Sequence, residues 1–504
     1  MKGNPLNKPV FIPVVFLLVL AVVGSVILVS CGGGGMDSTT TSGGGGSNFT
    51  RTVTTTISDP PICEPPAGQF AHVWVTVTKV RAHLSSTADG SATGWVDLVD
   101  LTSAPKQIDL LGGSSTECIL STLGSVASLP AGKYQQIRIH LMANSAPGSN
   151  PVPSPNNCSP LTNVFNCVQL DDDNGPKKEL KLSSQANTGI KIPPGQIAGG
   201  GLMLEADQTA DINIMFNACL SIVEQGNGQF RLKPTLRAGE VTTSDTLTGK
   251  VVEVTDPMTG ATGPLPSGAV VQVFLEDTSD PMNPKIIETI MTDASGNFTI
   301  CPVPQPVPTG GFTIVATAIV PDTSMNAGVT ATYNATVIFG VMPGTAIGDI
   351  GLIKEADPST PAQIDGVLTT SPNTLSPVSF QLAALQEVTG PGGATKVIVP
   401  TFSLPDEMIE SDSTAATDAM NTCPMDAPMG SICGNYTLFV PASNPRVGTT
   451  APAGPPVNFF VRADLDPAVT CNVNTQTTAA IEVMAGMTAN APRLDFNTCA
   501  AATP

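Results

Sequence analysis

The sequence is poor in cations. Its 504 residues include 22 Lys and Arg against 41 Asp and Glu, which gives a net charge of -19 and an isoelectric point near 4.4. This charge repels polyanions and argues against nucleic acid as a partner. With 48 Gly and 46 Pro, long helices are not expected. The 41% of hydrophobic residues excludes wholesale disorder, and the length favours two to four domains.

The common catalytic motifs are also missing. There is no G-x-S-x-G, no H-E-x-x-H, no P-loop and no G-x-G-x-x-G after a strand. Only three histidines occur, His72, His83 and His140, and no C-x-x-C accompanies them. A zinc site of the usual ligand pattern is therefore not expected. We expect ordinary surface histidines and no cofactor, with a three-histidine metal site as the alternative.

The N-terminus predicts export. Lys2 and Lys8 precede an apolar run from Val10 to Val29, and small residues follow, as in a secretory signal over residues 1–30. The run ends in Leu28-Val29-Ser30-Cys31, which resembles a bacterial lipobox. That resemblance implies that Cys31 is lipidated and becomes the mature N-terminus. The alternative is an uncleaved transmembrane anchor, because about 20 apolar residues can span a bilayer.

Residues 31–50 predict a flexible tether, because they are mainly Gly, Ser and Thr. We expect the protein to be held in the cell envelope by its lipidated N-terminus. Gly32 stands where an inner-membrane retention signal would usually place Asp. In a bacterium with two membranes, this favours the outer one.

Ten cysteines remain after Cys31, and an even number in an exported chain predicts disulfides. Short spacings predict three local pairs: Cys158–Cys167, Cys423–Cys433 and Cys471–Cys499. Their Cα separations should fall within about 4.4–6.8 Å. The sequence leaves the pairing of four others open: Cys63, Cys118, Cys219 and Cys301.

A first β-rich segment is expected over residues 51–241. Val73, Val75 and Val77 alternate with polar residues, as do Ile137 and Ile139, which predicts two half-buried strands. We expect these faces to pack against each other across a β-sandwich. Hairpins are expected over residues 170–182 and 212–232, and residues 116–128 look briefly helical.

Four motifs of this segment occur in a familiar order: Val77-Thr78-Lys79-Val80, Gly94-Trp95-Val96-Asp97-Leu98, the run Leu129 to Arg138, and Phe230-Arg231-Leu232-Lys233-Pro234. Together they resemble the bacterial and archaeal lipoprotein domain called domain of unknown function 4382. The resemblance implies an exported β-sandwich-like domain. It carries no established activity and no functional residues.

A second segment is expected over residues 244–356. Leu247 to Val251, Gly268 to Val273 and Thr292 to Ile300 resemble the carboxypeptidase regulatory-like, transthyretin-type β-sandwich. Asp293 to Asn297 supplies turn chemistry before the last of these strands. The resemblance implies a spacer or a weak binding module, and some such modules share the fold of starch-binding domains.

A third segment, residues 358–504, is expected to be a disulfide-containing β-domain. Its start, Ile364-Asp365-Gly366-Val367-Leu368, is similar to the start of the second segment. A step from Gly through one residue to an aromatic recurs in all three segments, at Tyr134, Phe298 and Tyr436. We interpret it as a turn followed by a core aromatic. The whole chain thus predicts an all-β fold of tandem antiparallel β-sandwiches, Ig-like or transthyretin-like, behind a lipoprotein signal peptide.

Candidate ligand residues are few. Trp74 shares a strand face with His72 and is a candidate platform for a sugar, whereas Trp95 is expected in the core. Asp171, Asp172 and Asp173 are candidate calcium ligands because calcium prefers hard oxygen donors. Glu276-Asp277 with Asp280 is a second acidic cluster, and neither has EF-hand spacing.

These observations favour a non-enzymatic, lipid-anchored envelope protein with a binding, adhesion or scaffolding role. Its partner would be another envelope protein or a glycan. The first alternative is a carbohydrate-binding module protein, which would need an exposed aromatic pair. The second is a secreted hydrolase with carboxylate chemistry in the first segment, which would gather several acids with raised pKa values in one pocket.

Overall fold

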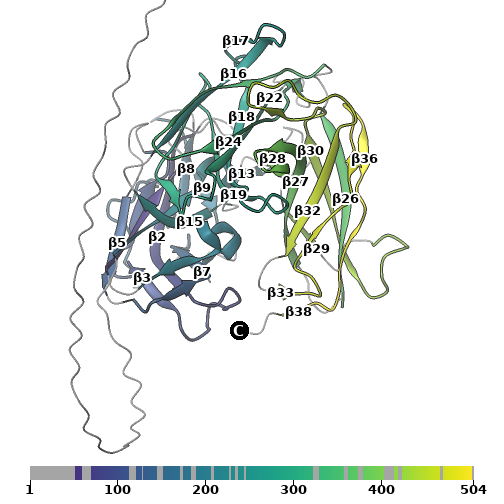
Figure 1. Cartoon of the computed structure of the whole chain (residues 1–504). Coiled ribbons are helices and arrows are strands. Elements are labelled where there is room, and N and C mark those ends of the chain that lie inside the picture. The colour runs from purple at the N-terminus through teal and green to yellow at the C-terminus, as the bar shows by residue number, and fades with distance from the viewer. Residues whose placement is uncertain are drawn as a thin grey trace, which may run out of the picture. The chain divides into compact units, whose positions relative to one another are not determined.

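The computed structural model describes residues 52–501 except 60–69, 113–120, 128, 145–150, 171–173, 183–188, 206–208, 226–228, 233–235, 243–245, 322–328, 357–360, 373–377, 402–413, 418–422 and 466–468. Cys31 and the expected signal and tether lie outside the described residues. The chain divides into two compact units, Met1–Ser47 and Asn48–Pro504, and the described residues all belong to the second. Strands dominate the described part, so the prediction of an all-β fold is confirmed (Figure 1).

The described residues of the first segment form fifteen strands, two 3-10 turns and one helical turn. They are β1 (Thr52–Ser58), β2 (Phe70–His83), β3 (Val96–Asp100), β4 (Lys106–Asp109), β5 (Ser121–Ala127), β6 (Gly132–Tyr134), β7 (Gln136–Leu141), β8 (Cys167–Leu170), β9 (Lys177–Lys181), β10 (Ile190–Ile192), η1 (Pro194–Gln196), η2 (Ala198–Gly200), β11 (Leu202–Leu204), β12 (Ala210–Phe216), α2 (Ala218–Ser221), β13 (Ile222–Gln225), β14 (Gln229–Leu232) and β15 (Leu236–Thr242).

These strands form two main sheets. One has the order β21-β15-β12-β1-β5, and β1 runs parallel to β12. The other has the order β10-β7-β2-β8-β9-β14-β13, with β3 and β4 also paired to β2; we call it the nine-stranded sheet. A short pair, β6 with β11, completes the segment.

The predicted core residues of this segment are buried. Val73, Val75, Val77, Ile137 and Ile139 have no exposed surface and belong to one hydrophobic cluster. However, β2 and β7 are neighbours in the same sheet and do not face each other. Their apolar faces share the cluster with side chains of the other main sheet, namely Val53, Ile57, Ile212 and Ile214.

Three local expectations have different outcomes. The hairpin at 170–182 is confirmed, because β8 pairs antiparallel with β9. The hairpin at 212–232 is confirmed in its second strand, β14, and wrong in its first: β14 pairs antiparallel with β13, whereas β12 joins the sheet of β1. The briefly helical reading of 116–128 is wrong for its described part, where β5 pairs along β1. Edge pairing with β1 outweighs the weak local helix preference there.

The second and third segments are built in the same way. The second comprises β16 (Leu247–Asp256), β17 (Ala261–Gly263), β18 (Val270–Asp277), β19 (Lys285–Met291), β20 (Asn297–Ile300), β21 (Val303–Gln305), β22 (Phe312–Pro321), β23 (Val329–Thr332), β24 (Thr336–Val341) and β25 (Ala346–Leu352). The third comprises β26 (Ala362–Thr370), β27 (Val378–Gly390), β28 (Gly393–Val399), β29 (Thr414–Thr417), β30 (Ile432–Val440), β31 (Arg446–Val447), β32 (Asn458–Leu465), β33 (Val469–Thr470), β34 (Thr475–Thr477), β35 (Ile481–Glu482), β36 (Thr488–Asn490), β37 (Leu494–Phe496) and β38 (Ala500–Ala501).

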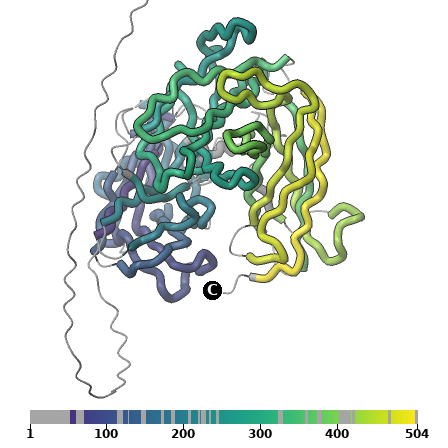
Figure 2. Tube along the Cα trace, in the orientation of Figure 1, coloured from purple at the N-terminus to yellow at the C-terminus, as the bar shows by residue number. Residues whose placement is uncertain are grey.

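In its described residues, each of these segments has two main sheets around its own core, and the third adds the short pair β33 with β38. In the second, β17-β16-β20 with β25 packs with β19-β18-β22-β24 and β23. In the third, β30-β26-β36 with β37 packs with β28-β27-β32-β34, β29 and β35. In Figure 2 the first segment is drawn in purple to blue, the second in teal and the third in green to yellow.

Neighbouring segments share sheets. Strand β21 belongs to the second segment in sequence, yet it pairs antiparallel with β15 of the first. Strand β31 belongs to the third segment and pairs parallel with β24 of the second. Each shared strand covers the edge of the sheet that precedes it. The backbone N–H and C=O groups of that edge therefore find partners across a segment boundary. We call this arrangement the interlock.

Candidate functional site

The histidines and tryptophans of the chain lie in one region of the first segment. All three histidines and both tryptophans of the chain lie on or next to β2, β3 and β7 of the nine-stranded sheet. On β2 the apolar side chains turn inward at Val73, Val75 and Val77, so His72 and Trp74 turn to the opposite face. We call that opposite face the outer face of the sheet.

Trp74 is not an exposed platform. It is only 7% exposed and packs with Cys158, Val164 and Cys167. The prediction that its face meets solvent is therefore wrong, because the disulfide-closed loop before β8 covers it. Lys177 places its Nζ 4.9 Å from the centre of the indole ring, and the His72 ring stacks on it at 4.7 Å.

His72 is held by Asp109. Its Nδ1 lies 2.5 Å from Oδ2 of Asp109, and the other oxygen of this carboxylate accepts the backbone N–H of Val73 at 3.1 Å and of Leu111 at 3.2 Å. Asp109 thus orients the imidazole and joins β2 to the end of β4. A carboxylate-oriented imidazole can act as an acid or base. Here its ring also forms one wall of the Trp74 packing.

The loop that covers Trp74 is fastened by amides. The Asn166 side chain accepts the Thr76 N–H at 2.9 Å and donates to the Met142 carbonyl at 2.6 Å. Gln107 donates to the Phe165 carbonyl at 3.0 Å and accepts the Asn157 N–H at 2.7 Å. These amides were not predicted, because nothing in their local sequence indicates which loop they contact.

The three predicted disulfides are present. Cys158–Cys167 and Cys423–Cys433 have Cα separations of 5.8 and 5.3 Å, inside the expected range. Cys471–Cys499 is also bonded, with a Cα separation of 4.0 Å that falls slightly below that range. Cys301 takes part in a disulfide as well.

Trp95 fastens a second loop to the outer face. The guanidinium carbons of Arg81 and Arg138 each lie 5.2 Å from its ring centre, and His83 contacts it at 5.1 Å. Its Nε1 donates to the Asp89 carbonyl at 2.8 Å. Trp95 is half-buried on this outer surface and does not belong to the hydrophobic core where we expected it.

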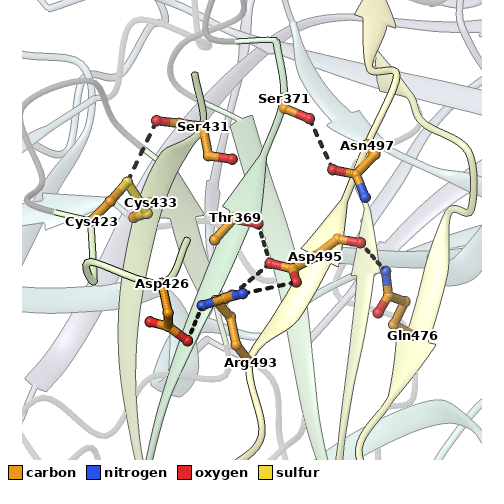
Figure 3. Close-up of polar contacts among 10 residues, drawn as sticks. All are labelled: Thr369, Ser371, Cys423, Asp426, Ser431, Cys433, Gln476, Arg493, Asp495 and Asn497. Carbon is orange, nitrogen blue, oxygen red and sulfur yellow. Dashed lines mark hydrogen bonds and ion pairs between the residues drawn. A yellow bond between two sulfur atoms is a disulfide. The ribbon is translucent and has the colours of Figure 1, made fainter. Parts of the chain in front are cut away.

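A polar cluster in the third segment holds the loop closed by Cys423–Cys433. Arg493 points to Asp426 of this loop on one side, at 2.7 Å, and to Asp495 of β37 on the other, also at 2.7 Å (Figure 3). Thr369 of β26 donates to Asp495 at 2.6 Å. The cluster therefore connects the disulfide-closed loop to the central strand of its sheet.

The acidic calcium candidates do not form a described site. Asp171, Asp172 and Asp173 lie outside the described residues. Of the second cluster, Glu276 turns inward to the Ile398 N–H, whereas Asp280 bonds to its own turn at Met282. Among the described residues, no group of three or more His, Cys, Asp and Glu is arranged to hold a metal ion.

Comparison with known proteins gives a partial assignment. The model of a domain of unknown function (DUF4382) matches residues 50–234, so the chain contains this domain in its first segment, as its motifs predicted. The resemblance of the second segment to a carboxypeptidase regulatory-like domain stays a prediction. No curated protein matches the chain.

Several solved structures show a weak likeness. GBS52, the minor pilin of Streptococcus agalactiae, has 11% identity over 52% of this chain and 98% of its own, with a TM-score of 0.16. The Bacillus anthracis TIE protein has 10% identity over 89% of this chain and half of its own, with a TM-score of 0.14. The shaft pilin SpaA of Lactobacillus rhamnosus GG has 13% identity over 52% and 99%, with a TM-score of 0.15. Likeness at this level assigns no function.

The described residues contain no helix that is both long and apolar enough to cross a membrane. The predicted anchor at Cys31 lies outside them.

Proposed function

We propose that this protein is a non-enzymatic, lipid-anchored scaffold of the cell envelope. The interlock carries the proposal, because strand sharing makes consecutive segments depend on each other. Separating two segments would break backbone hydrogen bonds such as Arg446 N–H to the Ala335 carbonyl and Gly448 N–H to the Val337 carbonyl, both at 2.8 Å. A chain built in this way suits the transmission of load better than a set of freely hinged modules.

Buried polar contacts reinforce the junction between the first and second segments. Arg237 of β15 donates to the Ile286 carbonyl of β19 at 2.5 Å. Asn217 donates to the Thr289 carbonyl of the same strand at 2.9 Å. Glu288, between them on β19, is buried near Arg237, and burial raises its pKa to about 8.

The junction between the second and third segments is built alike. Glu276 of β18 accepts the Ile398 N–H of β28 at 3.1 Å, and Arg462 of β32 donates to the Pro284 carbonyl at 2.8 Å. Apolar side chains also cross this boundary, since Phe274 and Val337 of the second segment belong to the hydrophobic cluster of the third. Such contacts resist hinge motion between the segments.

The buried acids also favour a scaffold over a hydrolase. A carboxylate mechanism would bring acids with raised pKa values together in one pocket. Here Glu276 and Glu288 meet partners at two different segment boundaries, and Glu355 accepts a hydrogen bond from Ser443 across the second boundary. Burial raises the pKa of Glu276 and Glu355 as well. The positions of these three acids are explained by structural contacts at the segment boundaries.

Pulling on single molecules tests the proposal. A mature chain held at residue 31 and at its C-terminus should unfold its second and third segments in one event. Arg446→Pro removes the N–H that pairs with Ala335 and should split this event into two at lower force. Arg446→Gln keeps that N–H and removes only the guanidinium, which donates to the Gly351 carbonyl of the second segment at 3.0 Å, so the difference between the two variants measures the backbone pairing. Independent unfolding of the two segments in the unaltered chain would contradict the proposal.

A further inference from the structure

Cys301 lies where the chain passes from the sheet of one segment to the sheet of another. Ile300, the last residue of β20, pairs with Leu247 inside the second segment. Val303, the first residue of β21, pairs with Thr242 of β15 in the first segment. Cys301 is only 5% exposed, and Ile300 and Val303 have no exposed surface. The cysteine is therefore enclosed at the boundary between the first and second segments, which we call the first junction.

The partner of Cys301 can be narrowed by elimination. Cys301 is disulfide-bonded, and it is the single cysteine of residues 244–356, so an intrachain bond cannot close within the second segment. The third segment has four cysteines, and these are bonded to one another in two pairs. In the first segment, Cys158 is bonded to Cys167. The cysteines that remain all precede the second segment: Cys31, Cys63, Cys118 and Cys219.

We propose that the disulfide of Cys301 crosses the first junction and joins the second segment covalently to the first. The predicted lipidation would use the thiol of Cys31, which leaves Cys63, Cys118 and Cys219 as partners within the first segment. Formation of the bond removes two protons and two electrons from the two thiols. An oxidised thiol–disulfide oxidoreductase of the exported compartment accepts them and is released as a dithiol.

The bond stands beside the strand pairing of the first junction. Strand β21 begins two residues after Cys301, and its three residues pair with residues 240–242 of β15. If these strands separate, the covalent link keeps β21 near the edge of β15 at a high effective concentration. The strands can then pair again without a search by diffusion, so this junction opens reversibly.

The boundary between the second and third segments, the second junction, is built differently. All four cysteines of residues 358–504 are used in Cys423–Cys433 and Cys471–Cys499, and both pairs close inside the third segment. Pairing of β31 with β24 and the side-chain contacts beside it are therefore not backed by a covalent bond. Under load the second junction should open first. This consequence rests on the proposed function, whereas the bond at Cys301 does not.

Cutting the chain between segments tests the crossing bond. A protease recognition sequence without cysteine, inserted after Ser244, separates Cys301 from every candidate partner. After cleavage and blocking of free thiols, denaturing electrophoresis without reductant should show both fragments as one band, and dithiothreitol should release them. The matched control carries the same insertion after Ser359, between the second and third segments. Its fragments should separate without reductant.

Cysteine variants assign the joined band to Cys301. In the chain cut after Ser244, Cys301→Ser should let the fragments separate without reductant. Cys423→Ser with Cys433→Ser removes a disulfide that closes inside the third segment and should leave the fragments joined. If Cys301→Ser does not fold, the cut chain with all its cysteines still decides the question.

Trypsin identifies the partner. Its cleavage sites place Cys301 and its three candidate partners on four separate peptides, which span residues 52–79, 107–133, 192–231 and 286–354. In an unreduced digest of the mature chain, mass spectrometry should find peptide 286–354 linked to one of the other three. Reductant should replace that mass by the masses of the two single peptides.

Three results would overturn the proposal. They are separation of the fragments cut after Ser244 without reductant, a thiol-blocking label on peptide 286–354, and a link between two copies of that peptide. If the bond fails in this way while the second and third segments still unfold in one event, the scaffold proposal stands. Joined fragments together with independent unfolding of these two segments would keep the bond and reject the scaffold.

Discussion

Tyr436 of β30 lies directly over Gly366 of β26. The two residues are cross-strand partners, and a Cβ atom on Gly366 would come within 2.1 Å of the phenol Cζ and Oη. The second segment repeats the arrangement with Phe298 over Gly249, where the corresponding distance is 2.6 Å. The glycine leaves room for the partner's ring, which explains why both residue types recur in the two segments.

Replacing this glycine should be costly. Gly366→Ala forces the Tyr436 ring out of its place, so we expect a loss of about 2–3 kcal/mol in the free energy of unfolding, measured by urea denaturation. Gly392→Ala is the matched control, because no atom lies within 4 Å of the added methyl, and should cost less than about 0.5 kcal/mol. Equal effects of the two substitutions would show that the ring does not need this space.

Opening the Cys158–Cys167 loop should uncover Trp74. In a Trp95→Phe background, Cys158→Ser with Cys167→Ser should shift Trp74 emission to the red and increase its quenching by acrylamide. The same change should cost about 2–3 kcal/mol, because a ring of this size restricts the unfolded chain. Cys423→Ser with Cys433→Ser is the control: it removes a disulfide of similar spacing and should leave the emission unchanged. Unchanged emission in both variants would mean that packing alone covers the indole.

Glu288 should make the protein less stable as the pH rises. Burial raises its folded-state pKa to about 8, against a usual value near 4.5. The unfolded chain releases this proton first, so the contribution of Glu288 is fully present below about pH 4.5 and is lost as the pH rises to about 8. Glu288→Gln should therefore flatten the decline in the free energy of unfolding over this window, by up to about 5 kcal/mol, as measured by urea denaturation at each pH. The exposed Glu482→Gln is the control, and an identical pH profile for wild type and Glu288→Gln would refute the assignment.

Loss of Cys31 should release the protein from the membrane. The predicted lipidation needs the cysteine thiol, so Cys31→Ser should appear in the soluble fraction or as an uncleaved precursor. Gly34→Ser, three residues further along the tether, should leave fractionation unchanged. A Cys31→Ser protein that is processed normally and still needs detergent would disprove lipidation at this residue.

Local pattern predicted much of the first segment. The alternation around Val75 and Ile137 correctly placed both residues in the core, and the turn at Asn174-Gly175 correctly predicted the β8–β9 hairpin. The change in apolar register on β2, from Val77 to Val80, also signals the register shift that the strand contains. That shift turns Lys79 and Arg81 to the outer face.

The predicted binding surface around Trp74 is buried, for a reason that lies in distant parts of the chain. Alternation states correctly that Trp74 and Arg138 turn away from the core, yet both are at least 90% buried. Two loops cover them, fastened by Cys158–Cys167 and by Trp95. Periodicity records which face a side chain takes, and it carries no information about what later covers that face.

The sequence by itself determined the all-β class, the three disulfides between cysteines 9 to 28 residues apart, and the main core strands of the first segment, because each depends on residues close together in the chain. The tertiary structure alone decided that β2 and β7 lie side by side, that β12 joins β1, and that β21 and β31 cross into preceding sheets. Several strands share the same alternation of apolar and polar residues, so the local sequence does not determine which of them pair. The choice among them depends on which edges are open and on the burial gained over the whole sheet, a sum over residues far apart in the chain.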